Sequence, residues 1–125
     1  ELKARFDEER NIFWAQALEK AGVHVVYGIV GYKTHTKIAL VARKDTDGLR
    51  TYVHVGTGNY HSKTARLYTD LGLFTCKNDI AEEITHVFHF LSGRSLMEDY
   101  QKLLVAPIHM KKQFLKKMKK ILLLR

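Results

Sequence analysis

The stretch that decides the fold is residues 33–59, KTHTKIALVARKDTDGLRTYVHVGTGN. It contains two apolar runs, 37–43 and 49–55, separated by Asp45-Thr46-Asp47-Gly48, a typical turn sequence. In the second run, apolar and polar side chains alternate, as expected of a strand that buries one face. The stretch therefore predicts two neighbouring strands joined by a short turn.

The sequence on either side predicts helices that pack on this sheet. Helices are expected at three places: 6–21, 79–91 with Asp79 as its N-cap, and 108–124. Further short strands are expected at 23–27 and 71–75, a loop or short helical turn at 60–68, and another short apolar run at 103–106. This order predicts an α/β fold, a mixed β-sheet with flanking helices.

The composition is that of a globular protein, with 46% apolar and 27% charged residues. No apolar run approaches the length of a membrane span, and the single Cys76 excludes an internal disulfide and fits a reducing cytoplasm. The net charge of +8 is confined to residues 101–125, since residues 1–100 hold 13 basic and 13 acidic side chains. A charge confined to one end does not support nucleic acid as a partner.

Candidate chemistry lies at the start of the first predicted strand. His35 and Lys37 are two positions apart, so on an extended chain their side chains face the same side. A neutral imidazole can attack phosphorus, and a neighbouring ammonium can neutralise the phosphate oxygens. A His-x-Lys pair is common by itself, but here residues 56–59, Gly-Thr-Gly-Asn, end the next strand. The two motifs together indicate a phosphate site.

The glycine turn 56–59 permits two interpretations. It is either a tight turn after a strand or an anion nest whose backbone N–H groups bind phosphate. A dinucleotide fingerprint is excluded because His61 stands where the third glycine belongs. His61 also replaces the second glycine of a P-loop, which excludes that motif.

Two family resemblances follow from these motifs. The His-x-Lys pair with the Gly-Thr-Gly-Asn turn resembles the phospholipase D superfamily signature, although Ala42 stands where its usual Asp belongs. A longer match, over segments 1–9, 21–28, 33–37 and 56–70, resembles bacterial polyphosphate kinase. That family moves the γ-phosphate of ATP reversibly onto polyphosphate through a phosphohistidine.

The resemblance implies roles for individual residues. His35 matches the phosphorylated histidine, Tyr68 matches the tyrosine that packs on adenine, and Arg5 matches an arginine in the phosphate and Mg²⁺ region. Phosphate contacts are inferred for the remaining motif positions: Lys37, Asn59, Lys63 and Arg66. Without the resemblance, Tyr68 would be read as a packing residue and Arg5 as a solvated one. The implied ligands are ATP or ADP, polyphosphate and the cofactor Mg²⁺.

The members of this family are longer than this chain, so we expect an incomplete domain and the start of another. Residues 1–100 are expected to form the C-terminal part of a first phospholipase-D-like catalytic domain, and residues 101–125 the beginning of a second. Such a chain supplies one wall of a site and is expected to be inactive alone. The alternatives are a phospholipase-D-like phosphodiesterase and a non-catalytic module that binds polyanions.

The basic helix predicted at 108–124 carries an apolar stripe on one face, formed by Phe114, Leu115, Met118, Ile121 and Leu122. We expect this stripe to pack on a partner domain and, without that domain, to drive homo-oligomer formation. Peripheral contact of the larger protein with a membrane is the competing interpretation of the lysine-rich helix. The expected location is the cytoplasm, with membrane association as an addition.

Overall fold

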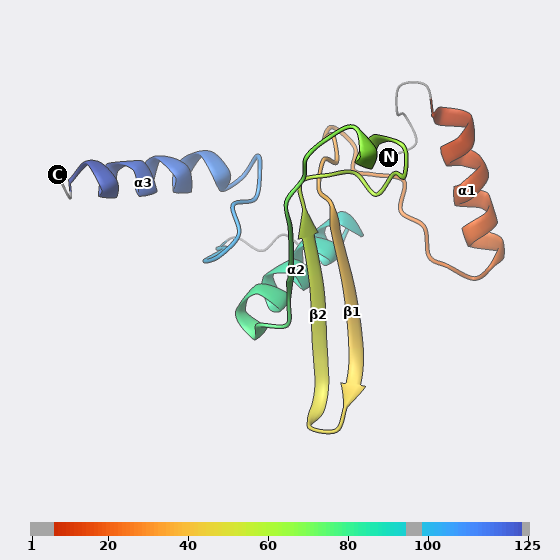
Figure 1. Ribbon diagram of the computed structural model, residues 1–125, viewed down its shortest axis with the longest axis horizontal. Coiled ribbons are helices and arrows are strands. Elements are labelled where there is room, and N and C mark those ends of the chain that lie inside the picture. Colours follow the sequence, from red (N-terminus) through yellow and green to blue (C-terminus); the bar gives the residue numbers. More distant parts are fainter. Residues whose placement is uncertain (1–6, 95–98, 124–125) are drawn as a thin grey trace.

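The computed structural model describes residues 7–94 and 99–123 and has a mixed α/β architecture. In chain order the elements are α1 (Glu8–Lys20), β1 (Ile38–Asp45), β2 (Gly48–Gly56), the 3₁₀ helix η1 (Thr64–Arg66), β3 (Gly72–Thr75), α2 (Asn78–Leu91) and α3 (Met110–Leu122). The sheet lies in the middle of the molecule, and α1 and α3 extend to either side of it (Figure 1). The α/β prediction is confirmed.

The three strands form an antiparallel sheet in the order β1-β2-β3. In its register Leu40 lies opposite Val53, and Val55 lies opposite both Ile38 and Leu73. Gly48 closes the turn between β1 and β2 with φ +126°, a conformation that favours glycine. The strands and the turn predicted from 33–59 are therefore confirmed, each to within a few residues.

Helix α2 covers one face of the sheet and makes the core with it (Figure 1). Its Ala81 and Ile84 are buried against Val53 of β2. The apolar side chains packed around them come from β1, β2, α2 and the segment after α2: Ile38, Leu40, Val55, Ile80 and Leu103. Full burial of an aliphatic side chain such as Ile84 contributes about 1.5–3 kcal/mol, so this contact fixes α2 on the sheet.

The strand predicted at 23–27 does not form. Residues 23–29 have no regular secondary structure, although their sequence is rich in β-branched residues. A strand needs a neighbour for its backbone hydrogen bonds, and the described part of the chain offers this segment none. The apolar run 103–106 lacks regular structure for the same reason.

Asp79 is not the N-cap of its helix, contrary to the sequence-based expectation. Helix α2 begins at Asn78, after Lys77. The Asp79 carboxylate instead accepts a 2.9 Å hydrogen bond from the N–H of Ile80 and lies 3.3 Å from the ammonium of Lys102. It therefore ties the first turn of α2 to the segment that follows residue 98.

Helices α1 and α3 stand away from the sheet (Figure 1). The apolar stripe of α3 is open to solvent along its length, with Leu115 and Met118 about half exposed and Leu122 more so. In α1, Phe13 and Trp14 are likewise exposed. Both helices thus present apolar surface that the other described residues leave exposed. No helix in the described residues is both long and apolar enough to cross a membrane.

Candidate active site

His35 and Lys37 lie together on the extended segment that leads into β1. The Lys37 Nζ atom is 2.9 Å from Nδ1 of His35 and donates a 2.7 Å hydrogen bond to the backbone carbonyl of His35. Because an ammonium can only donate, Nδ1 of His35 accepts the first of these bonds. The predicted same-side placement of the two side chains is confirmed, and the His35 side chain is exposed.

The glycine turn lies beside this pair because of backbone hydrogen bonds. The N–H of Gly56 donates to the carbonyl of Lys37 at 2.9 Å, and the N–H of Thr57 donates to the carbonyl of Leu71 at 3.0 Å. The first bond joins the end of β2 to the start of β1, and the second joins the turn to β3. The two predicted motifs therefore meet at one end of the sheet, where β1 begins and β2 ends.

Asp70 supports the turn from the other side. Its Oδ1 accepts a 2.9 Å hydrogen bond from the hydroxyl of Thr57, and that hydroxyl in turn accepts a 3.0 Å bond from the N–H of Leu71. The carboxylate lies so close to Gly58 that a Cβ there would sit 2.2 Å from Oδ2. A side chain at Gly58 would therefore force the Asp70 carboxylate to move, whereas no positive φ restricts this position to glycine.

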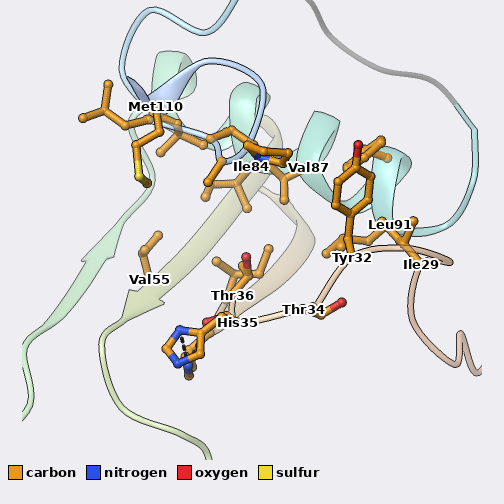
Figure 2. Close-up of a pocket in the computed structure, with 18 of the residues that line it drawn as sticks. Ile29, Tyr32, Thr34, His35, Thr36, Val55, Ile84, Val87, Leu91 and Met110 are labelled. Carbon is orange, nitrogen blue, oxygen red and sulfur yellow. Dashed lines mark hydrogen bonds between the residues drawn. The ribbon is translucent and has the colours of Figure 1, made fainter. Parts of the chain in front are cut away.

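A cavity of about 570 Å³ lies between this end of the sheet and α2. Figure 2 shows the ring of His35 at one end of it, with Ile84, Val87 and Leu91 of α2 along the other side. The lining also includes residues 103–107 and Met110. The reactive pair therefore borders a mainly apolar hollow made by three separate parts of the chain.

The residues expected to bind ATP all lie on the connection between β2 and β3. Asn59, Lys63, Arg66 and Tyr68 are exposed, Tyr68 by 70%. The 3₁₀ helix η1 fixes the backbone around Lys63 and Arg66, which confirms the short helical turn predicted there. Within the described residues, no hydrogen bond joins these four side chains to His35 or Lys37. The structure places them near one end of the sheet without assembling them into a closed site.

Arg5 lies outside the described residues, so its predicted role stays a prediction. Within residues 7–94 and 99–123, no group of three or more His, Cys, Asp or Glu side chains is arranged to hold a metal ion. Mg²⁺ commonly binds through substrate phosphates and one or two carboxylates, so a site of that kind would not require such a group.

The sequence patterns do not predict the contacts of two further residues, Asp70 and Glu83. The only sign of a role for Asp70 is that it belongs to segment 56–70, which resembles the family. Glu83 of α2 is buried and binds the backbone of residues 101–103, which no local sequence pattern indicates. Burial raises the pKa of the neighbouring Tyr100, and the charge of Glu83 raises it further.

An antiparallel sheet covered by a helix, with a His–Lys pair beside a glycine turn, is the phospholipase-D-like α/β fold that the sequence predicts. Residues 1–97 match the family described as polyphosphate kinase C-terminal domain 1. The chain therefore belongs to the polyphosphate kinase family.

Individual relatives agree with this assignment. The polyphosphate kinase of Synechocystis sp. is 61% identical over 113 residues, which are 90% of this chain and 16% of that protein. That of Staphylococcus epidermidis is 52% identical over 120 residues, 96% of this chain and 16% of that protein. The crystal structure of polyphosphate kinase from Porphyromonas gingivalis superposes with a TM-score of 0.77 at 31% identity, covering 94% of this chain and 20% of that one. The chain thus spans between a sixth and a fifth of the length of these relatives.

Proposed function

We propose that this chain carries the phosphohistidine site of an ATP:polyphosphate phosphotransferase. The observation that supports the proposal most strongly is the 2.9 Å approach of Lys37 Nζ to His35 Nδ1 at the mouth of the cavity. An exposed imidazole beside an ammonium has both parts needed for attack on a phosphoryl group: a nitrogen lone pair and a positive charge.

The proposed reaction has two half-reactions. A ring nitrogen of His35 forms a bond to the γ-phosphorus of ATP, while the bond from phosphorus to the bridging oxygen breaks and its electron pair leaves on ADP. The terminal phosphate oxygen of polyphosphate then attacks the phosphohistidine, and the N–P electron pair returns to the ring. The reverse sequence makes ATP from polyphosphate.

Lys37 is proposed to serve the first half-reaction by changing partners. In the free site its ammonium is bonded to the imidazole and to the His35 carbonyl. Phosphoryl oxygens carry more negative charge than either acceptor, so an incoming phosphate draws the ammonium away from Nδ1. This releases the imidazole and places the positive charge beside the group being transferred.

The glycine turn and its flanking cations are proposed to hold the phosphates of the nucleotide. Asn59, Lys63 and Arg66 are exposed, with no side-chain hydrogen bond to another described residue, and are free to take such contacts. Tyr68 offers an open ring face for the adenine. Mg²⁺ comes with ATP, and Arg5 is proposed to lie in the same phosphate region.

A phosphodiesterase of the phospholipase D type is the weaker candidate. Ala42, at the position of that superfamily's usual Asp, lies within β1 opposite Thr51 and offers no proton-transfer group.

We further propose that residues 1–100 and 101–125 belong to successive catalytic domains. We also propose that the reaction takes place in the cytoplasm and that residues 1–125 alone are inactive.

The direct test uses the full-length protein with ATP and Mg²⁺. The proposal expects ADP and acid-precipitable polyphosphate in matched amounts, and loss of both on His35→Ala, because no hydroxyl or thiol in the motifs can replace the imidazole. Lys44→Gln serves as the matched control, because Lys44 is an exposed lysine near the far end of β1 and does not line the cavity. Release of an alcohol from a phosphodiester without ADP formation, or polyphosphate synthesis by His35→Ala, would refute the proposal.

A further inference from the structure

Glu83 is a buried carboxylate that the proposed reaction does not use. It lies on the core side of α2 and is only 5% exposed. Its Oε1 accepts hydrogen bonds from the N–H groups of Gln101 at 2.7 Å and Lys102 at 3.1 Å. Its Oε2 accepts from Lys102 at 3.1 Å and Leu103 at 2.8 Å. One side chain thus binds three successive backbone N–H groups that lie 18 to 20 residues further along the chain.

This arrangement is not an ion pair within the described part of the chain. The ammonium of Lys102, the nearest cation in sequence, lies 3.3 Å from the neighbouring carboxylate of Asp79. The charge of Glu83 is therefore balanced by backbone dipoles, as in an anion nest. A buried carboxylate held in this way is costly to remove, because three N–H groups then lose their acceptor.

The three residues whose N–H groups bind Glu83 begin the segment that forms one wall of the cavity. Leu103 donates its N–H to Glu83 and packs its side chain against the core of Val53, Ala81 and Ile84. Residues 103–107 then run along the cavity that His35 and Lys37 border. The position of this wall relative to the reactive pair thus depends on where Glu83 holds residues 101–103.

The same segment is fixed further on by contacts that lead into α3. The side chain of Tyr100 is 2% exposed, and its ring meets that of His109 edge to face at 5.4 Å. The carbonyl of Val105 accepts hydrogen bonds from the N–H groups of His109 and Met110. Contacts therefore hold this segment at residues 100–103 and again where residues 105, 109 and 110 lead into α3.

We propose that Glu83 is a positioning residue for phosphoryl transfer. By holding residues 101–103 on α2, it fixes the cavity wall opposite His35 and sets the direction in which the chain enters the predicted second domain. In-line transfer depends on the placement of groups across the phosphate to within about 1 Å, so loosening this wall slows the chemical step more than it weakens nucleotide binding. The inference rests on the proposed function for its catalytic part.

The test uses full-length protein with two substitutions of graded effect. Glu83→Leu keeps the size and packing of the side chain but offers no acceptor, whereas Glu83→Gln keeps one acceptor oxygen. Glu82→Gln is the matched control, because Glu82 is the neighbouring carboxylate on α2 and is exposed. Hydrogen–deuterium exchange of the peptide 100–105 is measured alongside steady-state polyphosphate synthesis, and the peptide 48–56 in β2 reports whether the sheet stays intact.

Both readouts have definite expected values. Exchange at residues 101–103 should quicken about tenfold or more in Glu83→Leu, and less in Glu83→Gln, while peptide 48–56 stays protected. The kcat should fall in the same order, by about tenfold in Glu83→Leu, with KM for ATP changed by less than about threefold. Glu82→Gln should match the wild type in every readout.

Two outcomes would overturn the proposal. Unchanged exchange in peptide 100–105 of both variants would show that Glu83 does not hold this segment. Faster exchange with unchanged kcat would show that the wall does not position the reaction. If Glu83→Leu does not fold, Glu83→Gln alone decides between these results. Absence of polyphosphate synthesis in the wild type would instead refute the proposed function, and the exchange data would still report on the contact itself.

Discussion

The backbone N–H of Gly56 donates a 2.9 Å hydrogen bond to the carbonyl of Lys37. This bond extends the β1–β2 ladder by one step beyond the Ile38–Val55 pair, and it brings the glycine turn to Lys37, one member of the His35–Lys37 pair. Its position explains why two motifs about twenty residues apart belong to one site. The geometry of the turn therefore controls where a bound phosphate would lie relative to His35.

Gly58→Ala should damage the turn by steric conflict with Asp70. The added Cβ would lie 2.2 Å from Oδ2, so the carboxylate must move and its bond to Thr57 is lost. Overpacking of this kind costs about 1–3 kcal/mol, which thermal unfolding of the full-length protein can detect. In an Asp70→Ala background the same substitution should cost little. Equal losses in both backgrounds would contradict the assigned contact.

Tyr68→Ala should raise KM for ATP more than it lowers kcat. Stacking of a base on an aromatic ring is worth about 1–3 kcal/mol, which corresponds to about a tenfold loss of affinity or more. Tyr68→Phe is the matched control and should be nearly silent, because the ring face remains. A Phe variant as weak as the Ala variant would show that the hydroxyl, and not the ring, binds the nucleotide.

The β1–β2 hairpin should lose stability in acid through Asp45. Hydrogen bonds from Arg43 and Tyr52 hold the pKa of Asp45 below its ordinary value of 3.8. Because the folded protein binds this proton less tightly than the unfolded chain, the stabilisation is complete above pH 3.8 and is lost as the pH falls through the lower folded value. Urea unfolding should therefore find Asp45→Asn less stable than wild type at pH 7, with the difference shrinking below pH 3.8. A difference that is independent of pH would contradict this assignment.

Residues 1–125 alone should self-associate through α3. Leu115, Met118 and Ile121 are exposed on one face of the helix, and apolar burial contributes about 25 cal/mol per Å². Light scattering should show a mass that rises with concentration, and Leu115→Glu with Met118→Glu should abolish the rise. Lys120→Glu, on the opposite face, should leave association in place. A strictly monomeric chain at high concentration would exclude this role for the stripe.

Local patterns in the sequence were enough to predict the hairpin and its motifs. The alternation around Val53 gives the buried face of β2, and the turn at 45–48 joins it to β1. The same patterns place His35 and Lys37 on one side of the chain. These features depend on residues close in sequence or on one adjacent strand. A short stretch of sequence is therefore enough to predict them.

Features that depend on distant parts of the chain could not be predicted in this way. Residues 23–27 have the composition of a strand but lack a partner in the described residues. The role of Glu83 is set by backbone N–H groups 18 to 20 residues away, and an acidic residue within a helix is ordinarily expected to be exposed to solvent. Asp70 contacts Gly58 only because β3 returns beside the turn.

The most direct test of the central claim is to label the full-length protein with γ-labelled ATP and map the label to a residue. The account predicts one phosphoryl group per active site, stable in base and labile in acid as expected of phosphohistidine, located on His35 and discharged by added polyphosphate or ADP. His35→Ala should take up no label, and Lys37→Gln should take it up more slowly. Label on another residue, or full labelling of His35→Ala, would contradict the account.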